Sequence, residues 1–157
     1  MNLCDAKHFI NHENKRAAIS NSFPLKALLA ISHGSYLHGR FHRDFNINPK
    51  LADLRYDYWL KDLYRAGQVF SLTYDKKLVG FFGFSGHQIL LHALAPAFRG
   101  KGLAKFLWSA ACRELFRSRR KEITSSISAS NAPAHNLYIS LGFRFRNTLD
   151  VYHRLIS

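Results

Sequence analysis

The sequence is poor in cysteine, proline and acidic residues, and it has no long apolar run. Its two cysteines, Cys4 and Cys112, are too few for a disulfide framework or a multi-thiolate zinc site, so we expect free thiols in a reducing compartment. No apolar window approaches the roughly 20 residues of a membrane span. Asp5, Lys7 and His8 interrupt the first ten residues, where a secretion signal needs an apolar stretch. These absences predict a soluble, cytoplasmic protein with no membrane partner.

Acidic residues are strongly outnumbered by basic ones. Asp plus Glu total 10 against 23 Lys plus Arg, which gives a formal net charge of +13. This excess favours anionic partners such as nucleic acid, phosphorylated metabolites or an acidic surface, without choosing among them. An apolar fraction of 47% and a charged fraction of 21% are typical of globular chains. The 157 residues therefore predict a single domain, residues 1–157, with a core of its own.

Hydrophobic periodicity predicts a mixed fold of helices and strands. Residues 1–22 are weakly patterned, with at most one short strand. Helices are expected over 24–34, 49–66, 103–115 and 132–141, and strands over 69–74, 78–84, 88–94, 123–129, 143–146 and 150–156. The runs on either side of Asp75-Lys76-Lys77 predict an antiparallel hairpin. The order α-α-β-β-β-α-β-α-β-β indicates an α/β (mixed α+β) domain, in which a central mixed sheet of about six strands is flanked by helices.

The most informative segment is the turn Arg99-Gly100-Lys101-Gly102-Leu103-Ala104, which joins a predicted strand to a predicted helix. The first N–H groups of a helix have no partner within it, and the positive end of the helix dipole favours an anion there. Glycines allow a phosphate to approach the backbone closely, and Arg99 and Lys101 add two cations. The spacing fits neither a Walker loop nor a Rossmann fingerprint. The residues predict a pyrophosphate cradle, with an ordinary tight turn as the alternative.

This turn, with Pro96 three residues before it, resembles the Arg/Gln-x-x-Gly-x-Gly/Ala acetyl-CoA motif of the GNAT superfamily of N-acetyltransferases. A second block, Asn131–Phe143 (NAPAHNLYISLGF), is similar to that family's Asn-x-x-Ala-x-x-Leu-Tyr-x-x-x-Gly-Phe signature and also follows a predicted strand. The resemblance covers about residues 69–155. Residues 1–23 match poorly, and the family's usual first strand is hard to place. The resemblance implies a single GNAT-like domain that uses acetyl-CoA as co-substrate.

The resemblance also implies cofactor-binding residues in both blocks. Backbone groups at the end of the strand 88–94 would bind pantetheine, which places Ala93 and Leu94 beside the cofactor. Asn131 would contact the cofactor through its side-chain amide. The pyrophosphate would be held by the turn, whose residues are Arg99, Gly100, Lys101, Gly102, Leu103 and Ala104.

Two residues are candidates for proton transfer. The resemblance gives Tyr138 the role of protonating the departing thiolate, because a phenol with an ordinary pKa of about 10 is protonated at neutral pH. Alternatively, Tyr138 is a core aromatic. His92 is a candidate base for the acceptor amine, since imidazole titrates near about pH 6.5. Alternatively, His92 is a hydrogen-bonded core residue and water carries the proton. No catalytic triad is evident, so we expect direct transfer rather than an acyl-enzyme.

The acceptor side is expected in the basic and aromatic segment Ser35–Phe45. Arg40, His42 and Arg43 are candidates for binding phosphates. The segment resembles the Arg-Phe-His-x-Asp segment of acetyltransferases that modify amino-sugar nucleotides, which implies a small anionic amine such as a dTDP- or UDP-amino sugar. Alternatively, the aromatic residues are core and the arginines are solvated surface.

Two other function classes stay open beside the small-molecule enzyme. A protein or peptide N-acetyltransferase would need an acidic acceptor groove, and the net positive charge repels basic peptides. A non-catalytic nucleic-acid-binding module is disfavoured because no recognisable motif accompanies the basic residues. We expect no metal, since the nine histidines are scattered and Gly39 disfavours a helix that would pair His38 with His42. Monomer and homodimer both remain open.

Overall fold

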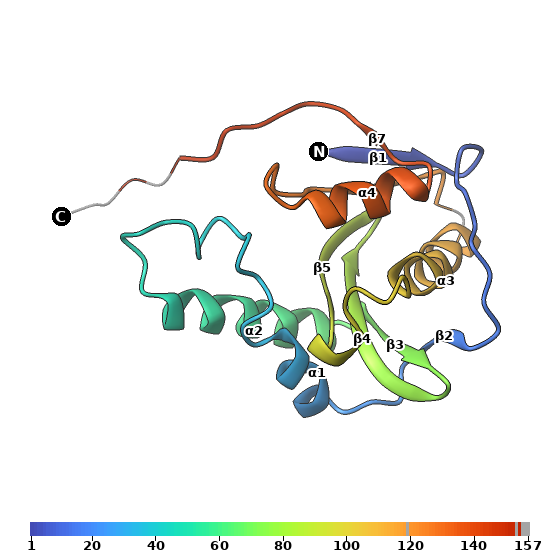
Figure 1. Cartoon of the computed structure of the whole chain (residues 1–157), viewed down its shortest axis with the longest axis horizontal. Coiled ribbons are helices and arrows are strands. Elements are labelled where there is room, and N and C mark those ends of the chain that lie inside the picture. Colours follow the sequence, from blue (N-terminus) through green and yellow to red (C-terminus); the bar gives the residue numbers. More distant parts are fainter. Residues whose placement is uncertain (119, 153, 155–157) are drawn as a thin grey trace.

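Seven strands form one mixed sheet in a computed structural model that describes residues 1–118, 120–152 and 154 (Figure 1). The strands lie in the order β2-β3-β4-β5-β6-β1-β7. Their bounds are β1 Asn2–Asp5, β2 Ala17–Ser20, β3 Val69–Tyr74, β4 Lys77–Ser85, β5 Gln88–Leu94, β6 Glu122–Ser125 and β7 Arg144–Phe145. The helices are α1 Leu25–Ser32, α2 Pro49–Arg65, the 3₁₀ turn η1 Pro96–Phe98, α3 Ala104–Arg117 and α4 Ala132–Ser140. The sheet and its helices confirm the expected fold class.

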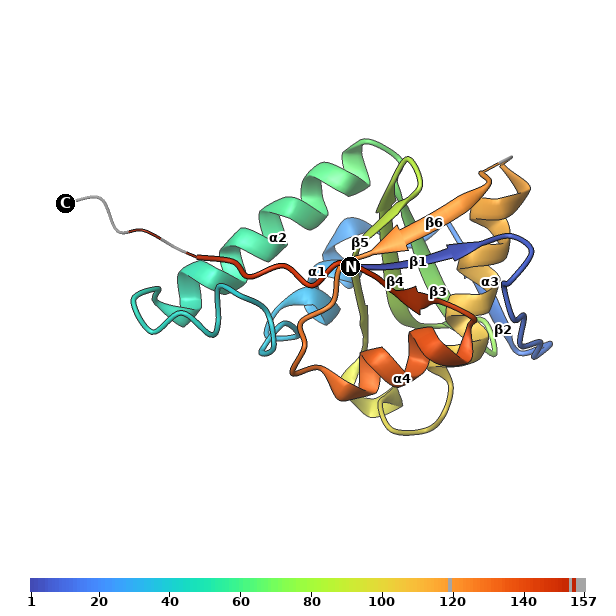
Figure 2. The same ribbon diagram turned by 90° about the horizontal axis from the view of Figure 1, so that it is seen from above.

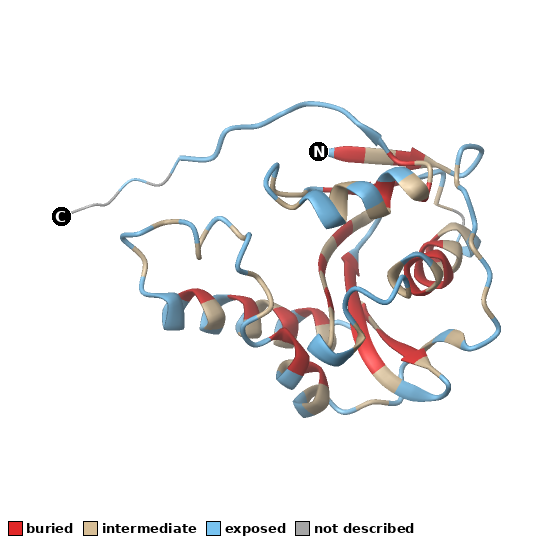
Figure 3. Cartoon of the chain, viewed as in Figure 1, coloured by how far each residue is buried: buried red, intermediate tan, exposed pale blue. Residues whose placement is uncertain are grey.

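Helices cover both faces of this sheet. Figures 1 and 2 show α1 and α2 on one face and α3 and α4 on the other. Successive side chains on a strand point to opposite faces, so the neighbours Phe81 and Phe82 belong to different cores, and both are fully buried. Figure 3 shows the buried residues along the central strands and the inward sides of the helices. Among the described residues, no helix is both long and apolar enough to cross a bilayer.

Local sequence signals explain where several elements begin and turn. The Asn48 side chain accepts a hydrogen bond from the Lys50 backbone N–H, and Pro49 occupies the first position of α2, as the sequence predicts. The β3–β4 hairpin turns through Asp75 and Lys76, which both have positive φ, 50° and 64°. That geometry matches the twist of paired strands, so the expected hairpin is confirmed.

The N-terminal segment contributes two strands where the sequence pattern indicates at most one. β1 is inserted between β6 and β7, with Asn2 opposite Ser125, and β2 pairs with β3 at the sheet edge. Each strand has four residues, too few for a clear alternation, so its position depends on the partner strands. The segment adds to the sheet and brings the total to seven strands.

The C-terminal strand expectation over 150–156 is wrong for the residues that the structure describes. Asp150, Val151, Tyr152 and Arg154 are not in a strand, and the rest of that range lies outside the described residues. The chain leaves the sheet after β7, as Figures 1 and 2 show, and Tyr152 is 87% exposed. A segment of alternating polar and apolar residues forms a strand only where the edge of a neighbouring strand is free to pair with it. Here the edge of β6 is already paired with β1. The strands expected at 123–129 and 143–146 are shortened to β6 and β7.

Gly142 joins the N-terminal segment to the end of α4, and its replacement tests that junction. It has φ +86°, and a Cβ there would collide with the His8 carbonyl oxygen. Gly34 has φ +72° and open space around a Cβ. We expect Gly34→Ala to lower the free energy of unfolding by about 1 kcal/mol, and Gly142→Ala by at least about 2 kcal/mol more. Urea denaturation measures both, and equal losses would contradict the tight junction.

Candidate active site

The parallel strands β5 and β6 pair at one end and then separate. Over the described sheet their register consists of Gln88↔Thr124 and Ile89↔Ser125, although β5 continues to Leu94. The Ala95 N–H donates to the Val79 carbonyl, which fixes the alternation of backbone groups along β5. Leu91 and Ala93 therefore direct their backbone groups toward β4, whereas His92 and Leu94 direct theirs toward the gap. The gap between the two strands is called the splay below.

The splay geometry bears on two residues expected beside the cofactor. Leu94 presents its backbone to the splay. Ala93 pairs with Phe81 of β4, so its backbone points away from the gap, and His92 takes the position that we expected for Ala93. Sequence periodicity identifies the strand. It does not show which alternate residues direct their backbone groups toward the paired edge and which toward the gap.

The turn after β5 has the geometry of an anion cradle. Gly100 and Gly102 have φ +70° and +68°, and a Cβ at either position would meet no atom within 4 Å. The first N–H groups that bond within α3 are those of Phe106 and Leu107, which donate to the Leu103 carbonyl. No side chain caps this helix end. The amides between Gly102 and Lys105 are thus placed to donate to an anion outside the helix.

The two cations of the turn lie differently. Arg99 donates from Nε to the Leu94 carbonyl at 2.8 Å and from Nη2 to the Ser35 hydroxyl at 2.8 Å. Its guanidinium therefore links the end of β5 to the loop after α1. Lys101 is exposed, with its Nζ 5.7 Å from the centre of the Phe98 ring. Lys101 is the cation of the turn whose charge is available to a phosphate.

Asn131 is the N-cap of α4. Its Oδ1 accepts a hydrogen bond from the Ala134 N–H at 3.2 Å. The side-chain carbonyl is thus engaged in capping, and its NH₂ group is the part left to contact a ligand. Asn131 lies in the loop that follows β6, at the splay side of the sheet.

Tyr138 and His92, from separate elements, form a hydrogen-bonded pair. The Tyr138 hydroxyl lies 3.0 Å from His92 Nε2 and accepts from the Ser125 hydroxyl at 3.3 Å. Tyr138 is fully buried and His92 is partly exposed, so His92 is nearer to solvent. The His92 ring packs edge-on against Trp108, with ring centres 5.1 Å apart.

Burial decides the protonation of this pair. It lowers the pKa of His92 to about 4, opposed in part by a hydrogen bond to the residue's own backbone. In the tautomer with the proton on Nδ1, Nε2 accepts from the Tyr138 hydroxyl. Burial also raises the pKa of Tyr138 well above its ordinary value. Both groups are neutral at pH 7.

The predicted acceptor residues are only partly brought together. Arg40 and Arg43 are exposed, and Arg43 donates to the Ser130 hydroxyl at the start of α4. The His42 side chain is 6% exposed, with Nε2 2.9 Å from Asp53 Oδ1. His42 therefore fastens the loop to α2 instead of facing a ligand. Ser35 and Ser130, which link this loop to the turn and to α4, carry no signal in the sequence.

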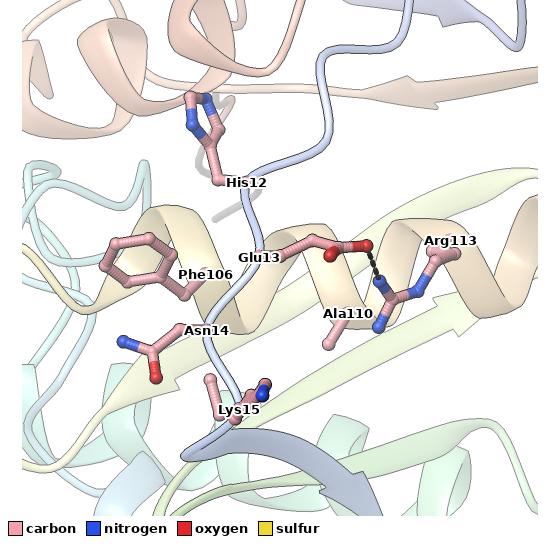
Figure 4. A pocket seen from close by; sticks show the side chains of 8 residues that line it. His12, Glu13, Asn14, Lys15, Phe106, Ala110 and Arg113 are labelled. Atoms are coloured by element: carbon pink, nitrogen blue, oxygen red, sulfur yellow. Dashed lines mark hydrogen bonds and ion pairs between the residues drawn. The ribbon is translucent and has the colours of Figure 1, made fainter.

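Two shallow hollows flank α3. One, of about 290 Å³, lies beneath the linker between β1 and β2, and an ion pair between Glu13 and Arg113 crosses it (Figure 4). The other, of about 320 Å³, adjoins the glycine turn and is lined partly by Phe98, Lys101 and Leu103. The second hollow shows that the turn is accessible from outside.

The thiols and potential metal ligands add little to the site. Cys4 and Cys112 are buried, and desolvation raises the pKa of Cys4 to about 11 and that of Cys112 further. Buried protonated thiols are poor nucleophiles. Within residues 1–118, 120–152 and 154, no three His, Cys, Asp or Glu side chains are grouped to hold a metal ion.

Comparisons with known proteins agree with this geometry. The sequence model of the Acetyltransferase (GNAT) family matches residues 37–143. A search of curated proteins found no match. A GNAT-family protein from Novosphingobium aromaticivorans DSM 12444 is similar in structure, with a TM-score of 0.62 and 20% identity over 92% of this chain. The chain spans only 58% of that protein's length.

Two further similar structures are complexes with CoA or acetyl-CoA. The aminoglycoside N-acetyltransferase AAC(6')-Iy in complex with CoA has a TM-score of 0.62 and 18% identity, over 88% of this chain and 93% of that one. The structure of yncA from Salmonella typhimurium with its cofactor acetyl-CoA has a TM-score of 0.55 and 17% identity, over 82% of this chain and 79% of that one. At these identities the likeness shows the fold.

The depressed pKa of His92 predicts acid sensitivity. The unfolded chain protonates His92 below its ordinary pKa of 6.5, whereas the folded chain resists until about pH 4. The unfolded state therefore binds more protons in this window, and stability falls as the pH is lowered through it. His92→Gln keeps an acceptor for Tyr138 but does not titrate. Between pH 7 and about 4.5, we expect the wild type to lose about 2–3 kcal/mol more unfolding free energy than the variant. Urea denaturation at both pH values tests this, and parallel losses would contradict the burial of a neutral imidazole.

Proposed function

Because the chain belongs to the acetyltransferase (GNAT) family, we propose that it is an acetyl-CoA-dependent enzyme that transfers acetyl directly to a primary amine of a small anionic acceptor. The observation that carries the proposal is the glycine turn at the open end of β5. Its outward amides, positive φ values and open Cβ space fit a pyrophosphate. The backbone of His92 and Leu94 offers a further edge for the amides of pantetheine.

Each cofactor-binding residue has a distinct part in this proposal. Acetyl-CoA supplies an acetyl group activated as a thioester. The amides of Gly100 to Ala104 hold its pyrophosphate, and Lys101 adds a positive charge. Asn131 donates from its NH₂ group while its carbonyl caps α4. Arg99 acts indirectly, because its guanidinium holds the end of β5 and Ser35 in place.

Tyr138 holds the proton that the leaving sulfur requires. Its O–H is directed at His92 Nε2, and rotation about the C–O bond redirects it without moving the ring. Because Tyr138 is fully buried, the thioester must enter the splay as far as His92 to meet that hydroxyl. Burial keeps the phenol protonated until charge develops on the sulfur.

The proton of the acceptor amine passes to water in this proposal. His92 was a candidate base, but its pKa of about 4 and the contact of its Nε2 with Tyr138 make it a poor proton acceptor at pH 7. The buried thiols supply no nucleophile for an acyl-enzyme, which supports direct transfer. His92 instead orients the Tyr138 hydroxyl.

The acceptor lobe, which comprises residues 33–59, supports an anionic substrate. Two of its three carboxylates, Asp53 and Asp57, are paired with His42 and His33, at 2.9 Å and 2.8 Å. Arg40 and Arg43 lie exposed on the same loop. An amino-sugar nucleotide combines an amine with phosphates that these arginines would bind. The aminoglycoside N-acetyltransferase among the similar structures also acts on a small-molecule amine, as its name states.

Replacement of Gly102 tests the cofactor site. At 100-fold excess over its dissociation constant, acetyl-CoA should stabilise the fold by about 2.7 kcal/mol, a rise of roughly 5–10 °C in Tm. Gly102→Val should abolish this rise, because the side chain fills the space that a phosphate needs. Gly67→Val is the matched control, since Gly67 has φ +67°, open Cβ space and a position at the end of α2. We expect both variants to lose similar stability and only the control to respond to acetyl-CoA in thermal denaturation. No rise in the wild type would contradict the proposed function.

Replacement of Arg40 and Arg43 tests the acceptor class. A thiol-release screen of amino-sugar nucleotides, polyamines, amino acids and peptides should favour an anionic amine. Arg40→Ala combined with Arg43→Ala should raise the KM of that acceptor at least about 10-fold, through the loss of charge-assisted hydrogen bonds. The KM of acetyl-CoA should stay within about twofold. Arg65→Ala, an exposed change on α2, and Ser130→Ala, which removes the hydroxyl that contacts Arg43 and Ser128, are the controls. A preference for polyamines would contradict the anionic acceptor.

A further inference from the structure

Polar side chains without partners are buried where β1, β6, α3 and α4 meet. Asn2 is fully buried, and neither atom of its amide has a hydrogen-bond partner within the described part of the chain. Trp108 is 3% exposed, and its indole N–H has no partner there either. A buried polar group without a hydrogen bond costs folding free energy, so two such groups in one place require an explanation.

Trp108 borders the Tyr138 hydroxyl, and Asn2 borders Ser125, which contacts that hydroxyl. Asn2 is directly opposite Ser125 in the β1–β6 pair, so their side chains share one face at neighbouring positions. The Ser125 hydroxyl donates to the Tyr138 oxygen at 3.3 Å. The Trp108 indole N–H is near enough to that oxygen to lower the pKa of the phenol. The Ser125 O–H thus donates to the phenol oxygen, the Trp108 N–H lies beside it, and Asn2 is next to Ser125 on the same face of the sheet.

The proton of that phenol points the other way. The Tyr138 hydroxyl lies 3.0 Å from His92 Nε2 and donates to it when Nδ1 carries the imidazole proton, which leaves the phenol oxygen to accept from the surrounding groups. A neutral phenol oxygen accepts few hydrogen bonds, whereas a phenolate accepts more bonds and stronger ones. The site therefore has more donors than the resting tyrosine uses.

We propose that Asn2, Trp108 and Ser125 are positioning residues that stabilise the Tyr138 phenolate at the moment when its proton passes to the CoA sulfur. The inference rests on the proposed acid role of Tyr138. In this step the O–H bond breaks, an S–H bond forms, and the oxygen keeps the electron pair. The phenolate then regains through water the proton that the acceptor amine has lost, so the proton count balances.

This arrangement explains why unpartnered groups persist in the core. Donors fixed in place before the reaction stabilise charge only where it develops, which favours the transition state over the ground state. The resting fold carries their desolvation cost. Removal of these donors should therefore leave the fold unharmed while it slows the reaction.

A double-mutant cycle separates this role from simple packing. Asn2→Leu and Trp108→Phe remove the polar groups and keep most of the volume. We expect a Tm equal to or above that of the parent, an unchanged KM for acetyl-CoA, and a kcat for thiol release about 10- to 100-fold lower. The acceptor is the best amine from the screen, or water if none is found. Ser32→Ala, which removes an unpartnered buried hydroxyl from α1, is the control and should keep kcat.

The same variants in a Tyr138→Phe background decide the inference. If they act through the phenol, they should cause no further fall in kcat once its hydroxyl is gone. Equal losses in both backgrounds, or no loss in the parent, would overturn the inference and leave the acid role intact. If Tyr138→Phe alone keeps kcat, the acid role and the inference both fail. The melting response to acetyl-CoA then still reports separately on the cofactor site.

Discussion

The early end of the pairing between β5 and β6 is the constraint on which the rest of the structure depends. Two residue pairs join the strands, and the remaining edge of β5 faces a gap. A buried sheet edge needs hydrogen-bond partners, and a ligand with amide groups provides them in place of a strand. The glycine turn begins at the end of that same edge, so one extended cofactor would contact both. In the proposed function, the splay thus sets where the cofactor lies and where the chemistry takes place.

Burial then determines what the side chains at the splay can do. His92 is held neutral by its surroundings, and its Nε2 lies 3.0 Å from the Tyr138 hydroxyl. In the proposed function this residue orients a hydroxyl and is not the base that the sequence suggested. Desolvation keeps Tyr138 protonated, and the side chains of Ser125 on β6 and Trp108 on α3 lie against its oxygen. The low polarity that protects the phenol also makes those donors effective.

The acceptor lobe is tied to both halves of the cofactor site by arginines. Arg99 reaches from the turn to Ser35, and Arg43 reaches from the acceptor loop to Ser130 beside α4. The pair of His42 with Asp53 fastens the same loop to α2. The lobe has four Lys and Arg residues against three carboxylates, a positive balance that agrees with the overall excess of basic residues.

The sequence by itself determined the elements from α1 to α4, the turn at Gly100 and Gly102, and the family, because these depend on local periodicity and on closely spaced motifs. Tertiary structure alone decided the places of β1 and β2, since four-residue strands have no position until a partner edge exists. It also decided which edge of β5 is open, so that the backbone of His92, and not that of Ala93, faces the splay. Finally, it buried His42, placed Ser125 and Trp108 beside Tyr138, and placed Asn2 opposite Ser125. Contacts between residues as distant as Asn2 and Ser125 arise only when the sheet assembles, so no local pattern contains them.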